Sequence, residues 1–306
     1  MTHFGLAIPQ TLTNGSFDAR CATDLAYQAE EAGFHSLWVG DGLTTPGVMD
    51  AWTILSYVGA STTSLYLGTS VLVLPWRNPI EVAKATATLD HLTNGRVILG
   101  VGIGDRVPAD AAFSVPTAHR ASFFEEQIEL IRKCWNEQPV ADTGGFWNFP
   151  EITVEPKPLQ THGPAIWFGG NASPALHRAA RLGDGWMGGG SSSTAAFIEN
   201  LGTIRKNLKQ LDREPTDFAL AKRVFIHVVS EDRVDSIISR LSKWSATIYG
   251  DTDIIPNCAI VGDPTYCIAK LSNLLDQDLN LILLDPLFDT SEQARRLQHD
   301  VLPELR

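Results

Sequence analysis

The sequence predicts an α/β fold, a (β/α)8 barrel of the TIM type with insertions. About eight apolar segments of strand length alternate with helical segments, and this count suits a closed barrel better than an open doubly wound sheet. Residues 65–101 form the clearest unit, because a strand, a helix and a second strand within about 40 residues make a βαβ unit with parallel strands. Periodicity alone does not establish closure, so an open sheet stays an alternative.

The βαβ unit is predicted from local signals. Residues 65–73 are apolar without polar alternation, which indicates a strand buried on both faces. Asn78 and Pro79 are suited to the cap and the first position of the helix that follows. The second strand, 96–101, runs into Gly102 and Gly104, where a ligand could approach the backbone closely.

The other elements follow in order along the chain. Further strands are expected at 3–8, 35–39, 165–168, 185–187, 218–229 and 279–284. Further helices are expected at 17–32, with Ser16 as its cap, and at 52–63, 119–136, 173–182, 194–211, 234–245, 265–275 and 291–302. Residues 105–117 are expected to be a loop, 138–163 an excursion with a small hairpin, and 248–262 a second irregular region. Without an interdomain linker, residues 1–306 are expected to form a single barrel domain.

Composition narrows the class of protein. The hydrophobic content of 44% suits a globular protein, and the net charge of −11 argues against nucleic acid or an anionic membrane as a partner. No apolar run approaches the length of about 20 residues that a membrane span needs. The cysteines lack CxxC spacing, so we expect buried thiols in a reducing cytoplasm. They are Cys21, Cys134, Cys258 and Cys267.

Glycine clusters follow two of the predicted strands. In a barrel of this kind the active site is built at the carboxyl ends of the strands. Gly169, Gly170 and Asn171 precede one helix, and Gly188 and Gly189 precede another, so adjacent loops could clamp one phosphate at two helix N-termini. Tight turns are the alternative explanation. The chain lacks HExxH, paired Cys/His ligands and GxSxG, so no metal is expected, and a phosphate-bearing ligand would supply the chemistry itself.

Several short motifs, in a fixed order, resemble one known family. The chain resembles the luciferase-like flavin monooxygenases, which include the coenzyme F420-dependent oxidoreductases, most clearly from the first strand to about Gly190. The motifs are EEAGF at 30–34, LWVGD at 37–41, LGTSV at 67–71, RNP at 77–79, TLD at 88–90 with NGR at 94–96, LGVGIG at 99–104, Pro164 with IWFGG at 166–170, and AARLGDGW at 179–186.

The resemblance implies a bacterial-luciferase-like barrel that binds FMN or F420 at its carboxyl end. The ring in such proteins rests on a bulge after the third strand, often with a non-prolyl cis peptide, which corresponds to Ser70 and Val71 here. Their cofactor phosphate lies at the two glycine loops. The residues expected to hold the cofactor are Thr69, Ser70, Val71, Gly104, Gly169, Gly170, Asn171, Gly188 and Gly189.

The expected catalytic residues are Asp41, Asp105 and Arg106. Many relatives have an acidic residue followed by His after the second strand, and that His is often assigned to catalysis. This chain has Asp41 followed by Gly42, so it keeps the acid and lacks the imidazole. A capping or loop carboxylate is the alternative for Asp41, and an internal salt bridge is the alternative for Asp105 and Arg106.

The leading hypothesis is a cytoplasmic flavin-dependent monooxygenase that uses reduced FMN and oxygen on a small organic substrate. F420-dependent hydride transfer is the main rival. A non-catalytic flavin-binding protein and a phosphate-binding barrel enzyme of unrelated chemistry are the other hypotheses. A flavin reductase and a second copy of the chain are the expected protein partners.

Overall fold

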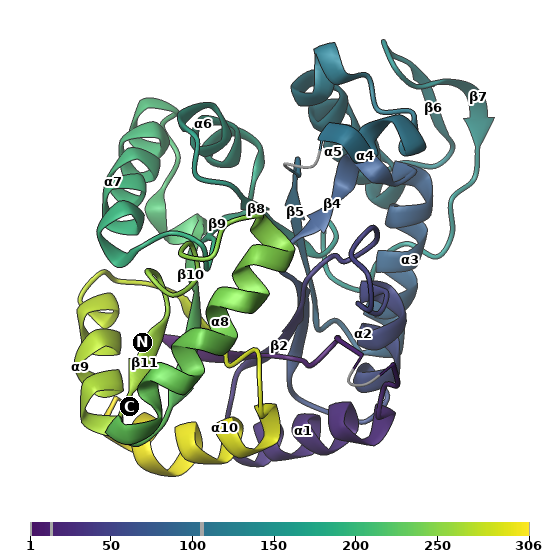
Figure 1. Ribbon diagram of the computed structural model, residues 1–306. Coiled ribbons are helices and arrows are strands. Elements are labelled where there is room, and N and C mark those ends of the chain that lie inside the picture. Colours follow the sequence, from purple (N-terminus) through teal and green to yellow (C-terminus); the bar gives the residue numbers. More distant parts are fainter. Residues whose placement is uncertain (1, 13–14, 105–106, 306) are drawn as a thin grey trace.

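The computed structural model describes residues 2–12, 15–104 and 107–305 (Figure 1). Eight parallel strands close into a barrel, as the sequence predicts. The ring runs β1-β2-β3-β5-β8-β9-β10-β12 and returns to β1. The strands are β1 (His3–Ala7), β2 (Ser36–Val39), β3 (Tyr66–Thr69), β5 (Val97–Gly102), β8 (Ala165–Gly169), β9 (Gly185–Gly188), β10 (Ala219–Val228) and β12 (Leu281–Asp285).

Helices alternate with these strands and surround the barrel (Figure 1). They are α1 (Ala19–Glu31), α2 (Ala51–Gly59), α3 (Pro79–Leu92), α5 (Arg120–Asn136), α6 (Ser173–Leu182), α7 (Thr194–Gln210), α8 (Val234–Tyr249), α9 (Pro264–Leu275) and α10 (Thr290–Arg296). Among the residues described, no helix combines the length and the apolar character that crossing a membrane requires.

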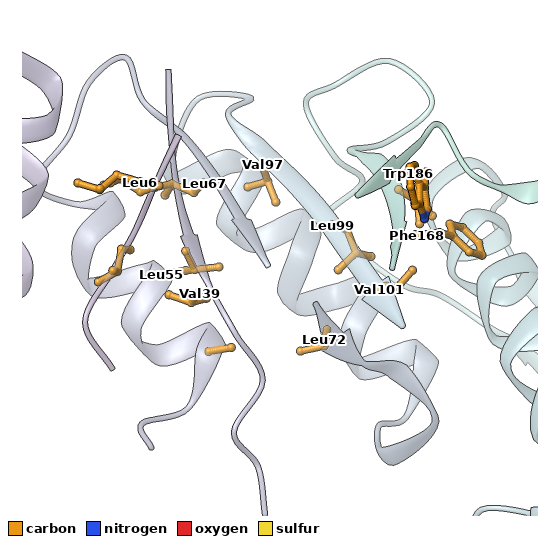
Figure 2. Packing of buried hydrophobic residues seen from close by; sticks show 14 of the residues in the cluster. Leu6, Val39, Leu55, Leu67, Leu72, Val97, Leu99, Val101, Phe168 and Trp186 are labelled. Atoms are coloured by element: carbon orange, nitrogen blue, oxygen red, sulfur yellow. The ribbon is translucent and has the colours of Figure 1, made fainter. Parts of the chain in front are cut away.

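Two apolar layers stabilise the barrel. Side chains from alternating strand positions fill its interior, where Trp38 and Trp167 stack with ring centroids 5.3 Å apart. The outward-facing positions pack against the helices, and Figure 2 shows this layer around Leu99 and Phe168. The strands are therefore buried on both faces, which explains why they are apolar without alternation.

The helix starts are only partly as predicted. Asn78 caps α3, since its side-chain oxygen accepts a hydrogen bond from the backbone N–H of Ile80 at 2.9 Å. The prediction that Ser16 caps the first helix is wrong. The cap of α1 is Asp18, whose carboxylate accepts from the N–H of Arg20 at 3.0 Å. Asp and Ser are comparably good caps, so two nearby candidates cannot be separated by residue type.

The predicted continuous strand at 65–73 is interrupted. β3 ends at Thr69, and a short strand β4 (Leu72–Val73) continues along β5. Gly68 pairs with Ile98, an offset of 30 residues, whereas Leu72 pairs with Val101, an offset of 29. One extra residue on the β3 side makes a bulge. The Ser70–Val71 peptide in this bulge is cis, as the resemblance implied.

The irregular regions contain more structure than the sequence indicates. The expected hairpin is present as β6 (Val140–Thr143) and β7 (Asn148–Ile152). The region 248–262 ends in a short strand, β11 (Ile260–Gly262), that pairs with β10. The predicted loop at 105–117 includes a short helix, α4 (Val107–Asp110). Cys134 and Cys267 are buried as expected, whereas Cys21 is exposed and Cys258 is half-buried.

The junction between β3 and β5 leaves no space for a side chain at Gly100. A Cβ there would lie 1.8 Å from the Thr69 carbonyl oxygen. We expect G100A to destabilise the protein by about 3 kcal/mol, because the backbone must separate. The control is G202A in α7, where the added Cβ would meet nothing within 4 Å beyond the helix's own backbone and alanine should stabilise the protein by about 0.5–1 kcal/mol. Urea unfolding measures both, and equal midpoints for the two variants would contradict the argument.

Candidate functional site

A cavity of about 370 Å³ opens at the carboxyl ends of β1, β2, β3, β10 and β12. Residues 44–48 and the end of α8 border it on the outer side. Of the predicted site residues, Asp41, Ser70 and Val71 line this cavity. Three tryptophans contribute to its wall: Trp38, Trp76 and Trp244.

The bulge after β3 fits closely onto glycines of the neighbouring strands. A Cβ built on Gly102 would lie 2.7 Å from Val71 Cγ2, and one on Gly169 would lie 3.0 Å from Val71 Cγ1. Gly104 lies against Val73 in the same way, with a distance of 2.7 Å to Cγ1. The predicted residues Val71 and Gly169 are therefore brought together, and the predicted Gly104 lies against Val73 in the same bulge region. The contacts at Gly102 and Gly104 need a residue without a side chain.

Thr69 serves the barrel rather than the cavity. Its side chain is buried, and its hydroxyl donates to the carbonyl oxygen of Gly100 at 2.6 Å. This hydrogen bond joins β3 to β5 immediately before the chain leaves the barrel at Ser70. Thr69 is not part of the cavity wall, so its contribution to the site is the position of the bulge.

The first glycine loop (169–171) and the second glycine loop (188–193) are neighbours in the structure. A Cβ on Gly189 would lie 3.8 Å from Nδ2 of the exposed Asn171. Gly170 has a φ of +122°, which side chains rarely adopt. The loops lead into the N-termini of α6 and α7, where backbone N–H groups favour an anion. Since Gly169 also touches Val71, the loops adjoin the bulge.

Lys222 is a site residue that the sequence interpretation missed. It lies in β10 beside Gly188, is 3% exposed, and donates from Nζ to the Ser192 carbonyl oxygen at 2.9 Å and to Ser192 Oγ at 3.0 Å. It also donates to the carbonyl oxygen of Gly189. Burial lowers the pKa of Lys222 to about 7; Cys258 opposes this shift and the positive charge of Arg223 adds to it. Lys222 Nζ thus ties the second glycine loop to strand β10.

Asp41 joins the loop after β2 to the bulge. Its Oδ2 accepts from the N–H of Val73 at 2.9 Å, and its Oδ1 accepts from Arg77 Nη2 at 2.9 Å and from the N–H of Leu43 at 3.2 Å. The side chain is 1% exposed although the residue borders the cavity. These hydrogen bonds are those of a positioning carboxylate, and the catalytic role of Asp41 remains a prediction.

Arg223 is the second residue that the sequence interpretation missed. Strand alternation directs it to the side opposite Lys222, into the cavity. Nε donates to Asp285 Oδ2 at 2.9 Å, Nη2 donates to the same oxygen, and Nη1 donates to the carbonyl oxygen of Ser70 at 2.8 Å. Burial alone would lower the pKa of Arg223, but the Asp285 carboxylate raises it, so the guanidinium stays charged. A Lys-Arg pair in the middle of the largely apolar segment 218–229 was the signal that could have identified both residues.

Two predicted catalytic residues, Asp105 and Arg106, lie outside the described residues. The adjoining Gly104 has a φ of +75°, and its carbonyl oxygen accepts from Arg120 Nη1 at 3.2 Å. Arg120 also forms an ion pair with the buried Asp110 at 2.7 Å. The roles of Asp105 and Arg106 therefore stay predictions.

Comparison with known proteins identifies related sequences. Residues 2–247 match the family model described as luciferase-like monooxygenase. An F420-dependent glucose-6-phosphate dehydrogenase of Kineococcus radiotolerans is 34% identical over 315 residues, covering 92% of each chain. An F420-dependent hydroxymycolic acid dehydrogenase of Mycobacterium tuberculosis is 28% identical over 304 residues, covering 92% of this chain and 83% of the relative.

Solved structures with little sequence identity share the fold. An F420-dependent secondary alcohol dehydrogenase in complex with an F420-acetone adduct has a TM-score of 0.85 at 18% identity, covering 100% of this chain and 99% of its own. The oxygenating constituent of 3,6-diketocamphane monooxygenase from Pseudomonas putida, in complex with FMN, has a TM-score of 0.78 at 14% identity. The match covers 99% of this chain and 98% of that one.

The buried lysine predicts a specific dependence of stability on pH. The folded protein loses the Lys222 proton near pH 7, whereas the unfolded chain keeps it up to the ordinary pKa of 10.5. Between these values the unfolded state binds more protons, so the stability of the wild type relative to K222M should increase as pH rises. Urea unfolding at several pH values from 7 to 10 measures this.

The control is K222R, because a guanidinium stays protonated in both states over this range. Its stability relative to K222M should not change with pH. K222M also loses the hydrogen bonds to Gly189 and Ser192, and this loss changes the free energy of unfolding by an amount that does not depend on pH. A wild-type difference that stays constant or decreases with pH would contradict the lowered pKa.

Proposed function

The chain belongs to the luciferase-like monooxygenase family, and from this premise we propose that it is an oxidoreductase that uses coenzyme F420. The two relatives described above, which match it over most of their length, are F420-dependent dehydrogenases. The contact between Val71 and Gly169 carries the structural part of the proposal. It joins the cavity at the bulge to the first glycine loop, as a ligand with a flat ring and a phosphate group requires.

The residues present fit such a cofactor. Gly102 accommodates the bulge because it lacks a Cβ, and Gly169 leaves Val71 little further room, so Ser70 and Val71 lie at the cavity wall. The glycine loops before α6 and α7 offer backbone N–H groups for a phosphate. Bound F420 supplies hydride transfer. The protein orients the ring at the bulge, anchors the phosphate at the loops, and excludes water with the tryptophans of the cavity.

A second candidate is the FMN-dependent monooxygenase that the sequence favoured. It is supported by the likeness in fold to the FMN complex described above. The same bulge and loops would hold FMN, and a flavin reductase would be needed to supply reduced cofactor. The proposals of a homodimer and of a cytoplasmic location apply equally to both candidates.

The absorption spectrum of the bound cofactor distinguishes the two candidates. We expect protein purified from a host that makes F420 to carry F420, and to exchange hydride with an added substrate. Bound FMN with oxygen-dependent turnover would favour the monooxygenase instead. A bound flavin that neither oxidises nor reduces anything would indicate a non-catalytic carrier. A colourless protein that binds neither compound would contradict both proposals.

The first glycine loop should be sensitive to the smallest substitution. G170A introduces a side chain at a φ of +122°, with its Cβ 3.1 Å from Ala175 Cβ, and should displace the phosphate-facing N–H groups. We expect cofactor affinity to decrease about tenfold, the equivalent of one lost hydrogen bond to a charged group. Fluorescence titration measures the affinity.

The matched control is G95A. Gly95 also has a positive φ, +79°, but it lies at the amino-terminal end of the barrel, before β5. G95A should cost similar stability and leave cofactor affinity unchanged. If both variants lose affinity equally, the effect of G170A is one of general stability and the assignment of the loop is wrong.

A further inference from the structure

The cavity has a distinctive charge arrangement. Among the lining residues that the structure describes, Arg223 is the one cation, and Asp41 and Asp285 are the carboxylates. Asp41 is already paired with Arg77, and Asp285 is paired with Arg223. The remainder of the wall combines apolar side chains, the three tryptophans among them, with the polar side chains of Gln10, Ser70, Tyr249 and several threonines. A ligand at this part of the wall therefore meets one cationic donor group and two carboxylates that are each already paired with an arginine.

The guanidinium of Arg223 has donor capacity beyond its contacts within the protein. It carries five N–H groups, and three hydrogen bonds join it to described residues: two to Asp285 Oδ2 and one to the Ser70 carbonyl oxygen. The side chain is 22% exposed and borders the cavity. Its bond to Ser70, at 2.8 Å, shows that a neutral carbonyl oxygen is a suitable partner at this position.

We propose that Arg223 binds the carbonyl oxygen of the organic substrate, and that the substrates are neutral ketones or aldehydes with an apolar body. This inference rests on the proposed oxidoreductase function and adds the substrate class to it. Arg223 then acts as a binding residue that fixes the carbonyl group beside the bulge at Ser70 and Val71. The apolar part of the substrate lies against the apolar side chains of the wall.

The surrounding charges favour a neutral carbonyl over a carboxylate. The Asp285 carboxylate contacts the same guanidinium, so a second carboxylate would be repelled by a like charge and would lose its hydration in a partly apolar site. A carbonyl oxygen carries no such cost and gains a hydrogen bond from a charged donor, which is stronger than one from a neutral donor. A hydrocarbon gains only the apolar contacts.

A purely structural ion pair is the competing explanation. Arg223 and Asp285 lie on the adjacent strands β10 and β12, and their pairing could serve only to join these strands. In that case the cavity would not distinguish ligands by their carbonyl group. The two explanations predict the same stability for the protein, but only carbonyl binding predicts that the cavity prefers ligands with a carbonyl group. The experiment therefore measures this preference.

The probes are acetophenone, ethylbenzene and benzoate, titrated into the oxidised protein without reductant and followed by quenching of tryptophan fluorescence. We expect acetophenone to bind about tenfold more tightly than ethylbenzene, and more tightly than benzoate. R223M should bring the ratio of acetophenone to ethylbenzene close to one, and R223K should restore part of it. Equal binding of the three probes to the wild type, or tighter binding of benzoate, would overturn the inference.

Two further variants keep the result interpretable. R223M leaves Asp285 buried without its partner, so R223M/D285L removes both charges in case the single variant fails to fold. R132Q breaks another ion pair, between Arg132 and Asp184, away from the cavity and should keep the full discrimination. Cofactor absorbance is recorded for each variant. A bound cofactor without ketone discrimination refutes this inference alone, whereas discrimination without a bound cofactor refutes the proposed function alone.

Discussion

The one-residue bulge after β3 is the constraint on which the rest of the site depends. The chain must leave the barrel at Ser70 while Val71 stays packed between Gly102 and Gly169. Three contacts fix this departure: the hydroxyl of Thr69 on β5, the Asp41 carboxylate on the N–H of Val73, and Arg223 on the carbonyl oxygen of Ser70. The groups that meet the bulge lie in β5, directly after β2 and in β10, so all three contacts form together only in the closed barrel.

Successive side chains of strand β10 point to opposite faces of the sheet, and two of them therefore serve two different parts of the site. Lys222 points outward and ties the second glycine loop to the strand, while Arg223 points inward to the cavity. Lys222 is buried and Arg223 is partly exposed to the cavity; both donate hydrogen bonds to backbone carbonyl oxygens, yet their electrostatics differ. Arg223 has a carboxylate beside it and stays charged, whereas Lys222 has only neutral acceptors and its pKa is lowered. A one-residue slip of this strand would exchange the two roles.

The barrel and the glycine loops could be predicted from sequence because their signals are local. Strand length, helix caps such as Asn78, and glycines before helices all lie within a few residues of one another. The partners of Asp41 could not be predicted in this way, since Val73 and Arg77 are more than thirty residues away in sequence. Lys222 and Arg223 were missed because a strand buried on both faces shows no alternation, so sequence does not say which neighbour faces the lumen. Only the closed barrel decides it.

The packing around Gly42, and not only the residue type at this one position, accounts for the missing imidazole after Asp41. A Cβ on Gly42 would lie 2.2 Å from Val48 Cγ1, so any side chain there requires the segment 43–49 to move. That segment is tied down by Leu12, which donates to the Gly47 carbonyl oxygen at 2.7 Å, and by a bridge between Thr11 and Val48. Both carboxylates of the described cavity wall are ion-paired, so neither is free to remove a proton from a hydroxyl group of a ligand. Arg223 can instead stabilise charge on an oxygen, which agrees with the inference that the substrate presents a carbonyl group.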